Sequence, residues 1–188
     1  MSLQQTPVAF IGIGNMGLGM ALRLRDAGQA VRVRDLDAAR CAEAAAGGAV
    51  VATSPAEVAQ GCDLLVVAVV DAVQTEAVLF GPGGAASALP AGATVMLCPT
   101  IGPADVERFA ARLAATGLGC IDAPMSGGPA RARDGSMSLM VACADALWTA
   151  HEPLLRQLAS RLFRISAKPG DGARTKLVNN LLGAVNLA

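Results

Sequence analysis

The stretch VAFIGIGNMG, from Val8 to Gly17, decides the fold class of this chain. Four apolar residues lead directly into Gly12, Gly14 and Gly17, and Asn15 opens a segment with helical periodicity. The G-x-G-x-x-G spacing is typical of a tight strand-to-helix turn whose helix N-terminus attracts a pyrophosphate. Because the chain contains 21 glycines, the spacing alone also leaves open a tight turn that binds nothing.

Short apolar runs alternate with helical segments along the rest of the chain. The runs that we expect to form strands are Val8–Gly14, Ala30–Asp35, Asp63–Val70, Ala93–Cys98, Gly119–Pro124, Ser138–Cys143 and Leu162–Ser166. The segments that we expect to form helices are 15–28, 37–48, 55–61, 103–117 and 144–159, and the Gly/Ala/Pro-rich segment 81–93 is expected to be a surface loop. This alternation predicts an α/β fold of the Rossmann type, with a doubly wound, mostly parallel sheet.

The composition excludes several classes of protein. The 188 residues are 53% hydrophobic and carry a formal net charge of zero, with no basic run to hold a nucleic acid. No apolar run is long enough to span a bilayer. The five cysteines are scattered and form no CxxC pair, so we expect reduced, mostly buried thiols, no metal site and a cytoplasmic protein.

An acidic residue, Asp35, ends the second predicted strand. Following a glycine motif at this distance, its carboxylate would accept hydrogen bonds from the ribose hydroxyls of a dinucleotide and repel a 2′-phosphate. This favours NAD over NADP. Arg32 and Arg34 leave NADP open, because either side chain would meet a phosphate if it turned inward.

The last segment has an unusual polar stripe for its apolar surroundings. On a helix, one side would carry Lys176, Asn179, Asn180, Gly183 and Asn186. Leucine, valine and alanine cover the remaining surface, whereas an ordinary surface helix would have a charged outer face. We therefore expect a buried helix whose polar stripe lines a cleft.

Few side chains are available to move a proton in this sequence. Tyrosine is absent, the single histidine, His151, has the setting of a surface residue, and Lys168 lies in a Pro/Gly loop. Lys176 remains, and partial burial would lower its pKa towards a useful range. The alternative is that Lys176 extends to water near the start of its helix. Helix geometry alone does not choose between these interpretations.

Three separated motifs in this order resemble the beta-hydroxyacid dehydrogenase family. They are the strand and turn GIGNMG, the stretch DAPMSGGPARARDGSMSLMV (Asp122–Val141) and the stretch GDGARTKLVNN (Gly170–Asn180). The family has 6-phosphogluconate dehydrogenase as a distant relative. The resemblance implies hydride transfer between NAD or NADP and a small 3-hydroxy acid of the 3-hydroxyisobutyrate, tartronate semialdehyde/glycerate or L-threonate type.

The resemblance also implies roles for individual residues. Lys176 would be the catalytic acid/base, with Asn180 beside it. Ser126, Gly127 and Gly128 would hold the substrate carboxylate through a hydroxyl and unhindered backbone N–H groups. Asn179 would be a further substrate-binding residue. Cofactor binding falls on Gly12, Ile13, Gly14, Asn15, Met16, Gly17, Asp35, Val69, Val70, Gln74 and Thr100.

Family members continue into an all-helical second domain. We therefore expect residues 1–166 to form a dinucleotide-binding domain and residues 167–188 to begin an interdomain helix, with the helical domain absent. The shortened chain is expected to be inactive alone, and the full-length form to be a homo-oligomer. Two alternatives are a non-catalytic nucleotide-binding or assembly module and an imine reductase-like enzyme, although imine reductases usually lack the lysine.

Overall fold

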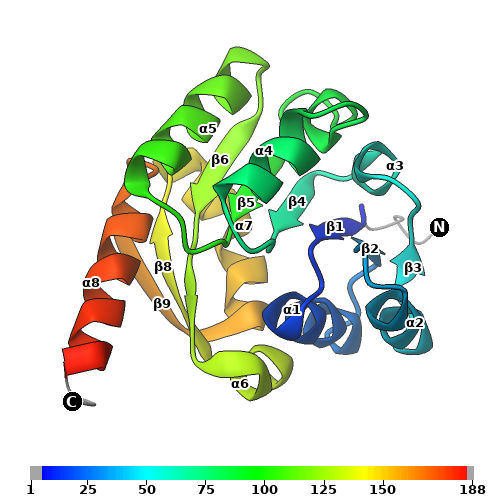
Figure 1. Ribbon diagram of the computed structural model, residues 1–188, viewed down its shortest axis with the longest axis horizontal. Helices are drawn as coiled ribbons and strands as arrows, with labels where there is room; N and C mark the ends of the chain where they lie inside the picture. The colour runs from blue at the N-terminus through cyan, green and yellow to red at the C-terminus, as the bar shows by residue number, and fades with distance from the viewer. Residues whose placement is uncertain (1–5, 186–188) are drawn as a thin grey trace.

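The computed structural model describes residues 6–185 and confirms the predicted α/β fold (Figure 1). Within these residues nine strands form one sheet in the order β3-β2-β1-β4-β5-β6-β8-β7, and β9 pairs with the other edge of β8. The strands are β1 (Val8–Ile11), β2 (Val31–Arg34), β3 (Val50–Val51), β4 (Leu64–Val67), β5 (Thr94–Leu97), β6 (Gly119–Asp122), β7 (Met125–Ser126), β8 (Met137–Ala142) and β9 (Ala159–Ser166). Pairing is parallel from β3 to β6 and between β8 and β9, whereas β6 and β7 run antiparallel to β8.

Helices cover both faces of this sheet. They are α1 (Asn15–Asp26), α2 (Ala38–Ala46), α3 (Pro55–Ala59), α4 (Ala72–Phe80), α5 (Pro103–Ala115), α6 (Gly128–Asp134), α7 (Asp145–Leu158) and α8 (Asp171–Val185). One core cluster joins the sheet to α1, α2, α6 and α7, and a second joins it to α3, α4, α5 and α8. Figure 1 shows α1 and α2 on the opposite side of the central strands from α4 and α5.

The central strands are apolar throughout because both of their faces are buried. Along β1, Val8 and Phe10 belong to one core cluster, while Ala9 and Ile11 belong to the other. Alternate side chains of a strand point to opposite faces, so a strand covered on both sides needs an unbroken apolar run. The Ala/Val/Leu-rich composition of the chain follows from this arrangement.

The structure adds elements that the sequence analysis did not predict. Helix α4 was missed because the apolar run before it was extended to Val70, although Asp71 accepts a hydrogen bond from the N–H of Gln74 and caps the helix. Helix α6 was missed because only Ala132 of its seven residues is buried, which leaves no apolar periodicity. The two-residue strands β3 and β7 are too short to carry a pattern.

The segment 81–93 is more than a surface loop. It contains a 3₁₀ turn at Ala85–Ser87, and Ala85 and Leu89 are buried in the core. The prediction for this segment was therefore wrong in part, because a few scattered buried residues carry too little periodicity to be recognised.

The thiols lie as expected. All five cysteines are free, and four of them are buried. Across residues 6–185 no three His, Cys, Asp or Glu side chains are grouped so that they could hold a metal ion. The same part of the chain has no helix of the length and apolarity needed to cross a membrane.

Candidate cofactor and active site

The glycine turn lies where the order of the sheet reverses. Strand β1 stands between β2 and β4, and ligands of doubly wound sheets bind in the crevice at the carboxyl ends of such strands. Gly12 follows β1 with a φ of +87°, and a Cβ built on it would lie 2.7 Å from the carbonyl carbon and oxygen of Ala68. A Cβ on Gly17 would lie 2.1 Å from the carbonyl oxygen of Gly12. Both glycines are therefore needed for close packing of strand, turn and helix.

Gly14 has a different role from its two neighbours. It is the N-cap of α1 with a φ of −62°, and a Cβ built on it meets no atom within 4 Å. Its missing side chain thus leaves open space over the first N–H groups of a twelve-residue helix. Because these N–H groups and the helix dipole attract anions, the turn fits a dinucleotide pyrophosphate.

The carboxylate of Asp35 lies against the glycine turn. Its Oδ2 accepts a hydrogen bond from the N–H of Ile13 at 2.6 Å, and its Oδ1 accepts one from the N–H of Asp37 at 2.9 Å. The same carboxylate therefore holds the turn and the start of α2. Free lone pairs on both oxygens remain for a ribose hydroxyl.

Two arginines near the glycine motif in the sequence, Arg32 on β2 and Arg40 on α2, each donate a hydrogen bond. Arg32 donates to the carbonyl oxygen of Gln60 at 2.7 Å, so its guanidinium is engaged away from the turn. Arg40, which the sequence analysis did not single out, donates to Oδ1 of Asn15 at 3.0 Å. The predicted helix 37–48 already placed Arg40 in the first turn of α2, but no signal in the sequence linked it to Asn15.

The loop after β4 borders the glycine turn. Here Val69 is half-buried and Val70 is 76% exposed. Oε1 of Gln74 accepts a hydrogen bond from the N–H of Val70 at 3.2 Å, which fixes the loop on α4. Val70 therefore offers an apolar surface beside the crevice.

A second group of predicted residues meets in a cavity of about 300 Å³. Its lining combines the start of α1, the segment after β5, strand β7, the start of α6 and helix α8. The lining residues are Met16, Cys98, Thr100, Met125, Ser126, Gly127, Gly128, Lys176 and Asn180. Cys98 and Met125 were missed because nothing distinguishes them from core residues in the sequence; burial raises the pKa of the Cys98 thiol, which therefore stays protonated.

The Ser126–Gly128 turn has a positive-φ backbone conformation at its two glycines, which favours glycine over other residues. Gly127 has a φ of +133° and Gly128 a φ of +81°. A Cβ on Gly127 would lie 3.0 Å from Cδ of Arg131, whereas one on Gly128 would meet nothing within 4 Å. The turn therefore presents backbone beside the Ser126 side chain without a bulky group in the cavity.

Lys176 is buried in this cavity, with only 9% of its surface exposed. Removal from water disfavours the charged amine and lowers its pKa from the ordinary lysine value. Within residues 6–185 no carboxylate forms an ion pair with it. The interpretation in which Lys176 extends to water is therefore wrong.

The other basic candidates lie elsewhere. Nε2 of His151 is 2.9 Å from Oγ1 of Thr94, the first residue of β5, whereas the cavity lies beyond the last residue of that strand. His151 is half-buried, not a surface residue as expected, and burial lowers its pKa. Lys168 is exposed in the turn before α8.

Helix α8 only partly matches its predicted stripe. Lys176 and Asn180 line the cavity, but Asn179 is exposed and is not among the lining residues. Gly183 faces open space, and Asn186 lies outside the described residues. The helix is buried at Lys176, whereas the side chains from Leu177 to Val185 are exposed in this chain.

These features define the class of the protein. A strand, a glycine turn and a helix at the switch point of a doubly wound sheet, with an acidic residue at the end of the second strand, form a dinucleotide-binding domain. The profile of the family described as "NAD binding domain of 6-phosphogluconate dehydrogenase" matches residues 7–166. The chain belongs to this family of NAD-binding domains.

Several characterised proteins are similar to this chain over nearly its whole length. L-threonate dehydrogenase of Cupriavidus necator is 40% identical over 96% of this chain and 61% of its own length. 2-Hydroxy-3-oxopropionate reductase of Escherichia coli is 33% identical over 96% of this chain and 61% of its own length. A crystal structure of 3-hydroxyisobutyrate dehydrogenase from Salmonella typhimurium superimposes with a TM-score of 0.91 at 38% identity, covering 97% of this chain and 64% of that one. The chain thus spans about three fifths of the length of the relatives it matches.

Proposed function

We propose that this protein is an NAD-dependent dehydrogenase of a small hydroxy acid, with Lys176 as the general acid/base. The observation that carries the proposal is the shared cavity, where a buried amine, an amide, a hydroxyl and a glycine backbone meet beside residues that follow the glycine turn and β5. The names of the similar proteins support a hydroxy acid or its oxidised form as substrate. Among them L-threonate dehydrogenases favour L-threonate as the first substrate to test.

The residues of the cavity have separate tasks in this proposal. A bound nicotinamide would accept hydride from the carbon that carries the hydroxyl group. The neutral amine of Lys176 takes the hydroxyl proton during oxidation, and the ammonium returns it during reduction. Its lowered pKa increases the neutral fraction near neutral pH. Asn180, one turn later on α8, hydrogen-bonds the substrate beside the amine.

The substrate carboxylate is assigned to the Ser126–Gly128 turn. The Ser126 hydroxyl and the backbone N–H groups of the two glycines are donors that suit a carboxylate. The positive φ values of Gly127 and Gly128 support this assignment, since they keep side chains away from the position of the carboxylate. A carboxylate fixed there and a hydroxyl at Lys176 would set the orientation of a short substrate.

A panel of small hydroxy acids tests the proposal. The full-length protein is assayed with L-threonate, 3-hydroxyisobutyrate and glycerate, each with NAD and with NADP, by formation of the reduced cofactor. We expect oxidation of at least one acid. Cofactor binding without oxidation of any acid in the panel would favour a non-catalytic nucleotide-binding module, and reduction of a cyclic imine instead would favour an imine reductase.

Asp35 is expected to set the preference for NAD. In Asp35→Ser the charge that repels a 2′-phosphate is gone, so the ratio of kcat/KM for NAD over NADP should fall by at least about tenfold, which corresponds to about 1.4 kcal/mol. The ratio is measured with the best acid of the panel. Asp37→Ser is the matched control, because Asp37 caps α2 through its side chain and serine preserves such a cap. An equal change in both variants would remove Asp35 from the specificity argument.

A further inference from the structure

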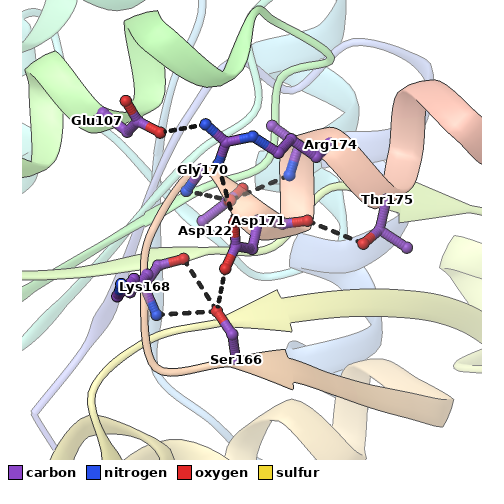
Figure 2. A network of polar contacts seen from close by, with 9 residues as sticks. Glu107, Asp122, Ser166, Lys168, Gly170, Asp171, Arg174 and Thr175 are labelled. Carbon is purple, nitrogen blue, oxygen red and sulfur yellow. Dashed lines mark hydrogen bonds and ion pairs between the residues drawn. The ribbon is translucent and has the colours of Figure 1, made fainter.

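Helix α8 begins without an N-cap side chain of its own. The residue before Asp171 is Gly170, with a φ of +105°. The first N–H groups of a helix have no partner inside the helix and need another acceptor. Here Oδ2 of Asp122 accepts from the N–H of Gly170 at 2.7 Å and from the N–H of Ala173 at 3.0 Å (Figure 2). The helix is therefore capped by the last residue of β6.

This capping carboxylate lies inside the protein. Asp122 is only 1% exposed. Burial raises its pKa, and the N–H groups of Ala173, Gly170 and Gly172 act in the opposite direction. A buried carboxylate is costly unless it is well hydrogen-bonded, and a helix N-terminus supplies both N–H donors and a favourable dipole. The buried Asp122 carboxylate is thus hydrogen-bonded to the N-terminus of α8.

The first turn of α8 has no room to move towards the sheet. A Cβ on Gly172 would lie 2.6 Å from the carbonyl oxygen of Met140 on β8 and 2.9 Å from Oδ2 of Asp122. Lys176 follows Gly172 by four residues, so both lie on the same face of the helix. The contact that holds Gly172 on the sheet therefore also sets the depth of Lys176 in the cavity.

We propose that Asp122 is a positioning residue: it holds the first turn of α8 on β6 and so keeps the Lys176 amine inside the cavity. The consequence for catalysis rests on the function proposed above, because the depth of the amine matters for rate only if Lys176 moves the proton. Asp122 itself contacts the α8 backbone, and it is not among the residues that line the cavity.

The same helix turn also carries an exposed ion-pair network. Arg174 contacts Glu107 at 2.6 Å and Asp171 at 2.8 Å, and the Asp171 carboxylate accepts a hydrogen bond from Ser166 at 2.7 Å (Figure 2). The Arg174 and Glu107 side chains are 52% and 48% exposed. Exposed pairs of this kind contribute little to position or stability. Glu107→Gln therefore provides a matched control that removes a carboxylate contact from the outer side of α8.

Kinetics of the full-length protein give the first test. Asp122→Ala should lower kcat for the hydroxy acid by about 100-fold, as expected when a reacting group is misplaced by about 1 Å. The Kd for NADH should stay near the parental value, and Glu107→Gln should be close to parental in both. The ionisation of Lys176 in the pH profile should move to higher pH, because a less buried amine is more basic. A lower melting temperature with parental kcat and pH profile would make Asp122 a stability residue only.

If Asp122→Ala does not fold, Asp122→Asn decides the question. The amide oxygen still accepts the two N–H bonds but carries no charge, so the hold on α8 is weaker. We expect a several-fold loss of kcat and the same direction of shift in the pH profile. If Asp122→Asn had the parental kcat and the parental pH profile, the proposal would be overturned.

A second readout does not require enzyme activity. The chain has only two lysines, Lys168 and Lys176. After ¹³C-methylation of the amines of the 188-residue chain, NMR follows each lysine through a pH titration, and Lys168→Arg assigns the signals. The Lys176 signal should titrate below the range of a free lysine in the parent and move towards that range in Asp122→Ala. An unchanged Lys176 titration in Asp122→Ala would overturn the positioning role of Asp122. If the titration shifts but the full-length protein oxidises no hydroxy acid, the positioning role stands and the proposed function is rejected.

Discussion

Lys176→Ala should lower kcat of the full-length protein by about 10²–10⁴-fold, the usual cost of removing a general acid/base. The Kd for NADH should change little, because the glycine turn and Asp35 are untouched. Lys176→Arg should restore almost nothing, since a guanidinium does not release its proton near neutral pH. Stopped-flow or steady-state formation of NADH measures the rate, and cofactor fluorescence measures the Kd.

Lys168→Ala is the control for this experiment, because Lys168 is the other lysine of the chain and is exposed. It should retain parental kcat. For oxidation, the neutral amine is the active form, so kcat/KM should rise with pH through the pKa of Lys176, below the ordinary lysine range. This ionisation should be lost in Lys176→Ala. An alanine variant with near-parental kcat would exclude Lys176 as the proton-transfer group.

Gly14→Val should weaken NADH binding by about 100-fold or more, with only a small loss of stability. The Cβ of the new side chain meets no protein atom within 4 Å, so only the weaker N-cap of valine acts on stability. It occupies the space through which a pyrophosphate would approach the α1 N-terminus, and hydrogen bonds to a charged group are each worth about 1.5–3 kcal/mol. Fluorescence titration with NADH measures the affinity, and thermal unfolding measures the stability.

Gly17→Val provides the contrast. Its Cβ would lie 2.1 Å from the Gly12 carbonyl oxygen, so this variant should lose thermal stability as well as affinity. If Gly14→Val bound NADH as tightly as the parent, the open space over α1 would not be the pyrophosphate site. If it unfolded like Gly17→Val, the separation of the two glycines into a binding and a packing role would be wrong.

Much of the fold was predictable because its signals are local. The runs around Phe10 and Val66 are apolar at every position, as strands buried on both faces must be, and a glycine lies within two residues of the end of each helix between them. The missed elements lack such signals. Helix α6 buries only Ala132 and so has no apolar periodicity. Helix α8 was predicted, but its apolar side chains beyond Lys176 are exposed.

The sequence alone determined the doubly wound fold, the glycine turn and the small set of side chains that could transfer a proton. These depend on residue types and short spacings, which act within one strand, turn or helix. Whether Lys176 is buried or reaches water was decided by tertiary structure, because the cavity around it is formed by four other parts of the fold that meet at one end of the sheet. The capping of α8 by Asp122 likewise spans 48 residues. Only the packing of β6 against the start of that helix brings the carboxylate and the N–H groups into contact.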